Sequence, residues 1–235
     1  MASAFLGQVF DDDHPAVVNR TTLSSTTEYA LMHGVREWLA GGSTGRIVET
    51  LRLHRHNCCS RSSPHTFLGN HDFPRLADVI APSLLPAAFC LLLTLPGIPG
   101  IYYGDEVATT STWVRGGPDS LLRPAMSPSD VERLDGLAHD LLATVRRLGA
   151  FRRANTWLTT GALEDISTRA GAVSYVVAGD GRSFRVRVNP TMQTVRFPPD
   201  EERSQPVLGT ATTENHHVEI PSRGWAIHRS PVFSR

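Results

Sequence analysis

The chain has 235 residues, of which 40% are hydrophobic and 20% are charged, and its formal net charge is zero. This composition is typical of a globular protein with a sizeable core, and the lack of a basic stripe excludes nucleic acid as an expected partner. The longest apolar run, residues 84–95, is interrupted by Pro86 and Thr94 and is too short to cross a bilayer, so no membrane association is expected.

Targeting and cysteine usage both favour a cytoplasmic location. The first residues, MASAFLGQVFDDD, contain neither a basic segment nor a cleavable apolar core, so we expect no signal peptide. The cysteines Cys58, Cys59 and Cys90 are odd in number, and free thiols in a reducing compartment are their simplest interpretation.

The N-terminal part of the chain alternates strand-like and helical patterns. Residues 4–10 are typical of a strand that the aspartate cluster at residues 11–13 ends, and Gln8 lies near the end of that strand. Residues 24–39 predict a strand and the helix after it, and residues 46–54 predict a second helix.

Histidines and cysteines gather after these helices. His54, His56, Cys58, Cys59 and His65 could ligate zinc, but their spacing matches none of the regular zinc patterns. A polar loop is the simpler interpretation, and we expect no metal and no other cofactor.

The most informative stretch is a polar triplet at the end of a predicted buried strand. Phe67, Leu68 and a glycine lead directly into Asn70, His71 and Asp72. An amide, an imidazole and a carboxylate together can bind several sugar hydroxyl groups, and the carboxylate can stabilise positive charge at a reacting carbon. The alternative is an ordinary strand end followed by an Asp-initiated turn.

A helix, a strand and an acidic loop follow this triplet. Residues 82–95 predict a buried helix, and the next strand begins near Ile98. Two tyrosines beside Asp105 and Glu106 suit the wall of a pocket. Alternatively, the tyrosines belong to the core and the two acids are solvated, so we expect these acids to lie outside the first layer of any site.

The next segment predicts a long helix. Ser127 is a typical N-cap residue, and apolar residues recur at helical spacing from Val131 to Leu148. Arginines near its end suit a solvated face or a contact with the next domain.

From about Asn155 the pattern changes to short strands separated by Pro, Gly and Asp, which indicates a β-sandwich. Residues 178–181, AGDG, predict a hairpin turn. We therefore expect two domains, residues 1–154 and 155–235. The expected strands are residues 173–177, 182–188, 195–197, 206–208, 216–220 and 225–228.

Three segments resemble the α-amylase family, glycoside hydrolase family 13. FLGNHD at residues 67–72 resembles the family's segment at the end of the seventh barrel strand, and GIPGIYYGDE at residues 97–106 resembles the eighth strand and its loop. VRGGPDSLLRPAM at residues 114–126 is similar to a run found in bacterial members. Because the three occur in the family's order, the chain is identified as a member that covers the family's second half.

This resemblance implies an α/β fold, a partial (β/α)8 TIM barrel consisting of its C-terminal half, followed by the all-β sandwich called domain C. A whole barrel takes roughly 250 residues, so the chain cannot contain one together with a β domain. The residues before the aspartate cluster resemble the family's fifth strand, whose motif carries the catalytic acid/base glutamate, and Gln8 occupies that position here.

The resemblance also assigns roles to four residues. Asp72 would be the carboxylate that stabilises the transition state, with Asn70 as its support, and His71 would donate to a sugar hydroxyl. Gln8 would occupy the acid/base position, but an amide cannot donate a proton to a leaving group and later take one from water.

The family's nucleophile segment, GxRxDxxxH, has no counterpart in this sequence. Retaining glycosidases need two carboxyl groups roughly 5–5.5 Å apart, so this chain is expected to be inactive by itself. The resemblance therefore implies a truncated gene product or one chain of a split enzyme. The expected ligand is an α-glucan or an α-glucoside. Open strand edges predict an N-terminal half-barrel partner or self-association.

The resemblance does not decide whether the family's reaction would be hydrolysis or transfer of the glycosidic bond. A non-catalytic module that binds carbohydrate or supports assembly is the alternative from another functional class.

Overall fold

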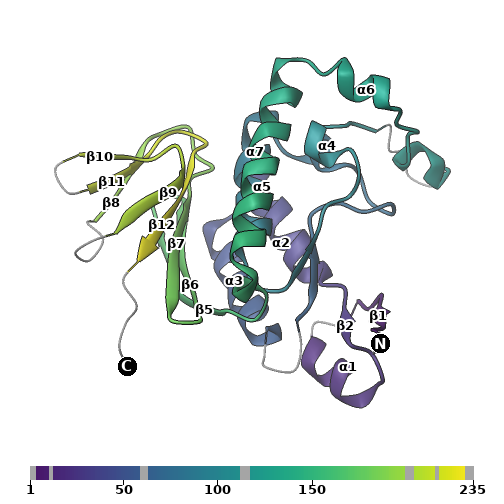
Figure 1. The fold of residues 1–235 in the computed structure, drawn as a ribbon, viewed down its shortest axis with the longest axis horizontal. Coiled ribbons are helices and arrows are strands. Elements are labelled where there is room, and N and C mark those ends of the chain that lie inside the picture. The colour runs from purple at the N-terminus through teal and green to yellow at the C-terminus, as the bar shows by residue number, and fades with distance from the viewer. Residues whose placement is uncertain are drawn as a thin grey trace.

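The computed structural model describes residues 4–10, 13–58, 63–111, 117–198, 204–214 and 217–230. Within these ranges, helices and short parallel strands form one part of the molecule and antiparallel sheets form the other (Figure 1). Asp11, Asp12, Cys59 and residues 114–116 of the family-like segment lie outside the described residues.

Four short strands follow one another in chain order and lie parallel. They are β1 (Leu6–Gly7), β2 (Ser25–Thr26), β3 (His65–Phe67) and β4 (Ile98–Gly100). β1 pairs with β2 and β3 pairs with β4, and a parallel bridge between Thr27 and His65 joins the two pairs. Parallel strands joined by helical crossovers are the repeating unit of a (β/α) barrel, so this part of the chain is a partial barrel.

Helices connect and cover these strands. α1 (His14–Arg20) lies between β1 and β2, and both α2 (Tyr29–Leu39) and α3 (Thr44–Asn57) lie between β2 and β3. Side-chain caps begin two of these helices, because Asp13 and Ser43 accept hydrogen bonds from backbone amides in the first turns of α1 and α3. The short helix α4 (Leu76–Val79) and then α5 (Leu85–Thr94) precede β4.

Where one long helix was predicted after Ser127, the chain makes two. α6 (Pro128–Glu132) ends before Arg133, and α7 (Gly136–Ala154) begins with a new cap, in which Asp135 accepts a hydrogen bond from the Ala138 amide. An Asp-Gly pair favours a cap over a continuous helix, because Asp satisfies the free amides and Gly weakens a helix interior.

Short 3₁₀ turns fill the remaining connections of this part. They are η1 (Pro82–Leu84), η2 (Asp105–Val107), η3 (Asp119–Leu122) and η4 (Thr156–Thr159). η1 leads directly into α5, so the helix predicted over residues 82–95 is present.

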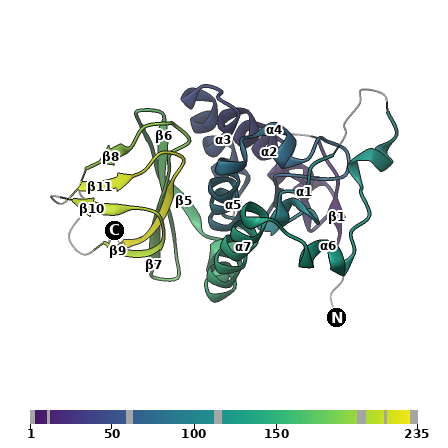
Figure 2. The same ribbon diagram turned by 90° about the horizontal axis from the view of Figure 1, so that it is seen from above.

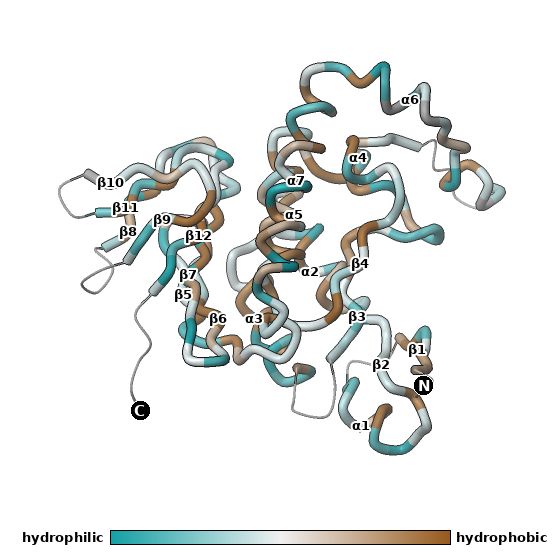
Figure 3. The backbone as a smooth tube through the Cα atoms, viewed as in Figure 1, coloured by the Kyte–Doolittle hydropathy of each residue, from teal (hydrophilic) through white to brown (hydrophobic). Residues whose placement is uncertain are grey.

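The core is centred on α5, which is apolar on nearly every side and almost completely buried. Figures 1 and 3 show α5 beside α7, between the barrel strands and the β domain. The Thr94 hydroxyl of α5 lies 2.6 Å from the Tyr175 hydroxyl of the β domain, and both side chains are buried. Arg152 of α7 is buried and donates to the backbone carbonyls of Leu93, Leu95 and Gly97. This arginine therefore contacts the end of α5 and the segment after it, and not the next domain, whereas the other arginines near the end of α7 are exposed, as one of the two expectations had it.

The C-terminal part consists of two packed antiparallel sheets (Figure 2). One has five strands in the order β5-β6-β7-β12-β9, and the other has three in the order β10-β11-β8. No helix follows Thr159 among the described residues, as the change of pattern predicted. The strands are β5 (Ala162–Arg169), β6 (Ala172–Gly179), β7 (Arg182–Val188), β8 (Val195–Phe197), β9 (Gln205–Gly209), β10 (Thr212–Glu214), β11 (His217–Ile220) and β12 (Trp225–Ser230).

The predicted hairpin turn between β6 and β7 is present. Asp180 and Gly181 both have positive φ, 56° and 66°, which a two-residue type I′ turn requires. The break between the two predicted domains stays a prediction, although α7 ends at Ala154 and the first strand of the β domain begins at Ala162. No helix among the described residues is long and apolar enough to cross a membrane.

Candidate active site

Polar and aromatic side chains follow the carboxyl ends of all four parallel strands. Gln8 comes directly after β1, Tyr29 begins the helix after β2, the triplet Asn70–Asp72 follows β3, and Tyr102 follows β4. The carboxyl ends of parallel strands meet at one end of a barrel, where barrel enzymes carry their active sites. A cavity of about 320 Å³ lies here, lined by residues that include Gln8, Tyr29, Asn70, His71 and Tyr102. We call it the strand-end cavity.

Tyr29 joins the residues from β1 and β3. Gln8 Nε2 donates to the Tyr29 hydroxyl over 2.9 Å, and Asn70 Nδ2 donates to the same oxygen over 3.3 Å. Burial raises the pKa of the Tyr29 phenol, and the nearby Asp72 carboxylate adds to this against the lowering effect of the two amides. The phenol therefore keeps its proton at neutral pH and can donate it to a ligand hydroxyl.

Gln8, which lines the strand-end cavity, lies within hydrogen-bond reach of Asp72, with Gln8 Nε2 at 3.4 Å from Asp72 Oδ2. Asp72 Oδ1 lies 3.2 Å from His71 Nε2 and 3.9 Å from Arg123 Nη2. Asp72 is half-buried, while His71 and Gln8 are exposed. The four residues predicted from the sequence therefore lie at one place, together with Tyr29, which the sequence pattern assigned only to a helix.

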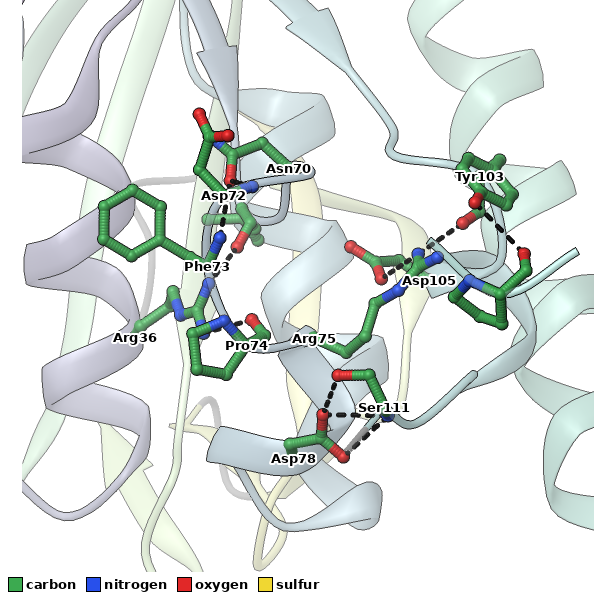
Figure 4. Close-up of polar contacts among 12 residues, drawn as sticks. Arg36, Asn70, Asp72, Phe73, Pro74, Arg75, Asp78, Tyr103, Asp105 and Ser111 are labelled. Atoms are coloured by element: carbon green, nitrogen blue, oxygen red, sulfur yellow. Dashed lines mark hydrogen bonds and ion pairs between the residues drawn. The ribbon is translucent and has the colours of Figure 1, made fainter. Parts of the chain in front are cut away.

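The carboxylate of Asp72 is placed by a tight turn. Asn70 Oδ1 accepts hydrogen bonds from the backbone amides of Asp72, over 3.0 Å, and Phe73, over 3.2 Å (Figure 4). A polar turn was one of the two interpretations of this triplet, and Asn70 rather than Asp72 initiates it. A turn here is compatible with a binding site, because the turn directs the Asp72 carboxylate at the amide of Gln8, which lines the strand-end cavity.

A buried arginine holds the backbone around this turn. Arg36 of α2 donates to the carbonyls of Leu68 over 3.2 Å and Pro74 over 2.7 Å, one on each side of the triplet (Figure 4). Because a guanidinium presents several donors in a fixed plane, one side chain can fix both ends of the segment.

Arg75 holds the loop after β4. It is fully buried, lies 3.2 Å from Asp105 Oδ1 and donates to the Tyr103 carbonyl (Figure 4). Its guanidinium also lies 4.2 Å from the centre of the Tyr102 ring. Burial raises the pKa of Asp105 to about 6, against the opposite effect of Arg75. Asp105 is buried, so it is not solvated, and it is not part of the lining of the strand-end cavity.

Gly69 is required where the segment after β3 passes close to Asp105. A Cβ on Gly69 would lie 2.0 Å from Asp105 Oδ2, which Arg75 holds in place. We expect Gly69→Ala to lower the free energy of unfolding by about 1–3 kcal/mol, as overpacked cores do. Urea denaturation measures this change. Gly136→Ala is the matched control, because no atom lies within 4 Å of its added Cβ, and equal stability of the two variants would contradict the prediction.

The histidine and cysteine group considered for zinc is used differently. Buried His54 lies 2.7 Å from Glu28 Oε2 through Nδ1, Asn57 Nδ2 donates to Glu28 Oε1 over 3.0 Å, and Cys58 Sγ lies 3.6 Å from His54 Nε2. Over the part of the chain that the structure describes, no group of three or more His, Cys, Asp or Glu side chains is placed to hold a metal ion. Cys59 lies outside that part.

The comparisons with known proteins agree with this architecture. Residues 35–161, more than half of the chain, match the family model of the α-amylase catalytic domain. The chain is 25% identical over 205 residues to a maltogenic α-amylase from Bacillus acidopullulyticus, covering 82% of this chain and 33% of that protein. It is 24% identical over 149 residues to a 4-α-glucanotransferase from Thermotoga neapolitana, covering 52% and 34%.

Solved structures show the same fold. The α-amylase from H. orenii superposes with a TM-score of 0.80 at 22% identity, covering 97% of this chain and 53% of that one. The α-amylase from Geobacillus thermoleovorans, solved with acarbose, gives a TM-score of 0.75 at 19% identity, covering 96% and 53%. The chain thus spans about a third of the length of these two relatives and about half of the length of these two solved chains. On the family model, the relatives and the shared fold, the chain belongs to the α-amylase family, glycoside hydrolase family 13.

Proposed function

We propose that this chain forms the C-terminal half of a retaining, α-glucan-active barrel, residues 1–154, with a β-sandwich domain over residues 155–235. In this proposal the strand-end cavity holds the sugar ring on which the complete enzyme acts. One observation carries it. Gln8, Tyr29 and Asp72 come from three successive strand ends, and the Gln8 amide joins them, donating to the Tyr29 hydroxyl over 2.9 Å and to Asp72 Oδ2 over 3.4 Å. Gln8 and Tyr29 line the strand-end cavity.

Each residue has a role that its chemistry permits. The Asp72 carboxylate would stabilise positive charge at the anomeric carbon, and its placement by Asn70 keeps its orientation fixed before the ligand binds. His71 and the phenol proton of Tyr29 would donate to ring hydroxyls.

Gln8 limits what this chain can do. Its amide donates hydrogen bonds but cannot transfer a proton to a leaving group, and the sequence holds no match to the family's nucleophile segment. We therefore propose that the chain does not turn over a glycoside unless an N-terminal half-barrel joins it. Exposed apolar side chains on β1 and β4 and directly after β4, namely Leu6, Ile98 and Ile101, support such a partner, because exposed apolar surface favours association.

A non-catalytic carbohydrate-binding or assembly module is the second candidate, and Gln8 is the observation that favours it. This candidate predicts carbohydrate binding without turnover even when Gln8→Glu and an N-terminal half-barrel are both supplied. The half-enzyme proposal predicts turnover under that condition.

Ligand binding tests the site itself. We expect the 235-residue chain to bind acarbose, and Asp72→Asn to weaken binding about tenfold, because a hydrogen bond to a charged group contributes about 1.5–3 kcal/mol. Isothermal titration calorimetry measures the affinity. Asp140→Asn is the matched control, since that side chain is exposed on α7. Equal affinities for both variants and the unmodified chain would contradict the assignment of Asp72.

A further inference from the structure

The four barrel strands leave two edges without a partner strand. Their order is β1, β2, β3 and β4, joined by two strand pairs and by the bridge between Thr27 and His65 (Figure 3). Among the described residues, no other strand pairs with the outer side of β1 or of β4. We call these sides the β1 edge and the β4 edge. An unpaired edge presents backbone donors and acceptors to any strand that approaches it.

The backbone groups of the two edges complement each other. On β1, the carbonyls of Phe5 and Gly7 accept hydrogen bonds from the side of β2, so the amide and carbonyl of Leu6 face away from it. On β4, the Ile98 amide donates toward β3, so the Pro99 carbonyl faces away. Because proline has no N–H, β4 presents only an acceptor at its edge, and β1 presents the donor that matches it. Two β4 edges would instead bring acceptor against acceptor.

Exposed apolar surface gathers at the same two edges. Nine large apolar side chains are exposed among the described residues, and six of them lie on β1 or β4 or within three positions of these strands. The six are Phe5, Leu6, Phe10, Ile98, Ile101 and Tyr103. Because single exposed apolar residues are usually scattered, such a concentration marks a surface that associates with another protein surface.

Two of these side chains have the position of barrel-interior residues. Leu6 lines the strand-end cavity, and Ile98 lies opposite His65, another residue of that lining, in the register of β3 and β4. In a closed barrel, bulky side chains that point inward fill the interior in layers. Here Leu6 is 54% exposed and Ile98 is 45% exposed, so further strands are needed to bury them.

We propose that a second copy of this chain covers both edges, with β1 of each copy pairing with β4 of the other, so that two copies close one eight-stranded barrel. The four strands are parallel, so a two-fold axis along the barrel brings the β1 edge of one copy to the β4 edge of its partner at both contacts. Four strands are half of the eight that such a barrel contains, so the assembly closes at two copies. A net charge of zero leaves no overall repulsion between the copies.

This inference rests on the proposed function for the half-barrel and names a partner for it. The second copy would cover the open side of the strand-end cavity, which Leu6 and Ile101 line. An N-terminal half-barrel would use the same two edges, so it would compete with the second copy. Because a second copy repeats the same sequence, it adds no nucleophile segment, and the pair of copies is also expected not to turn over a glycoside.

Sedimentation equilibrium of the 235-residue chain, without ligand, tests the proposal. We expect twice the mass of one chain. Leu6→Lys and Ile98→Asp should each weaken this association about a hundredfold or more, because each places a charge in the closed interior. Both side chains are exposed in the single chain, so neither substitution should unfold it. Met192→Lys is the matched control, because Met192 is exposed in the β domain between β7 and β8, and this variant should keep twice the mass.

Mixing the two edge variants, Leu6→Lys and Ile98→Asp, identifies which edges meet. In a mixed pair, one contact between β1 and β4 is unmodified, and the other brings together the two substituted positions, which have opposite charges. We expect the mixture to regain twice the mass of one chain, which also shows that both variants fold. A dimer that forms through two β1 edges or two β4 edges would instead be sensitive to one substitution only.

The proposal is wrong if the unmodified chain sediments as a single copy or as assemblies larger than two copies. It is also wrong if either edge variant keeps twice the mass, or if their mixture stays at the mass of one chain. Acarbose binding is measured separately. A single copy that binds acarbose would overturn this proposal alone, and a pair of copies that does not bind acarbose would overturn the proposed function alone.

Discussion

Replacing His54 with alanine should lower the free energy of unfolding at pH 6 by about 3–5 kcal/mol, the usual result of removing one partner of a buried ion pair. His54 and Glu28 are both inaccessible to solvent, with His54 Nδ1 at 2.7 Å from Glu28 Oε2. Without His54, the carboxylate keeps only the hydrogen bond from Asn57 and has no cation beside it in the core.

This contribution should depend on pH in one direction. Burial by itself would lower the pKa of His54, but the neighbouring Glu28 and Cys58 more than offset burial and raise the pKa well above its ordinary 6.5. The folded state therefore binds a proton that the unfolded state has released. The stabilisation is fully present below about pH 6.5 and is lost as the pH rises through the raised pKa of the folded state.

Urea denaturation between pH 6 and pH 9 checks both points. The difference in unfolding free energy between the unmodified chain and His54→Gln, which removes the titration, should shrink as the pH rises. His139→Ala is the matched control, because His139 is 75% exposed on α7, and it should change stability little. A His54→Ala variant as stable as the His139→Ala variant at pH 6 would contradict this account of the pair.

The sequence predicted those features that depend on local pattern. The strand after which Asn70, His71 and Asp72 emerge, the buried α5 and the Asp180–Gly181 turn each depend on neighbouring residues, so periodicity and turn chemistry were sufficient. Placing Gln8 beside Asp72 required more, because the two are 64 positions apart, and there the family resemblance supplied the expectation.

Features that depend on distant partners were not predicted. Tyr29 has the pattern of a helix residue, and its bridging role needs Gln8 and Asn70, which the fold brings to it from 21 and 41 positions away. The pair of His54 with Glu28 spans 26 positions in the same way. A histidine, a tyrosine or a glutamate has no local pattern that indicates which distant group it will meet.

Strand β5 was missed for a different reason. Its residues, ALEDISTR, are mostly polar and exposed, because β5 is an edge strand of the five-stranded sheet. Its pairing with β6 is interrupted between Glu164 and Ser167, where Asp165 has a φ of 44°. A bulge of this kind breaks the two-residue alternation by which strands are recognised.

Restoring the acid/base residue should not restore catalysis by itself. Gln8→Glu supplies a proton donor, whose lack costs about 10²–10⁴-fold in rate, but it supplies no nucleophilic carboxylate. We expect the Gln8→Glu variant of the 235-residue chain to release no more product from a natural α-glucan than the unmodified chain does. Reducing-sugar release from amylose measures this. The same variant mixed with an N-terminal half-barrel should gain activity if the halves assemble, and turnover by Gln8→Glu alone would contradict the prediction.

The absence of a nucleophile is the central claim, and an activated substrate tests it most directly. An aryl α-maltoside has a leaving group that needs little help from a general acid, so Gln8 does not limit its cleavage and the lack of a nucleophile does. The measurement is the rate of aryl alcohol release by the unmodified 235-residue chain, beside its Asp72→Asn variant and buffer. The account predicts equal release in all three. Release by the unmodified chain that Asp72→Asn abolishes would contradict the assignment of this chain as a half-enzyme that cannot act alone.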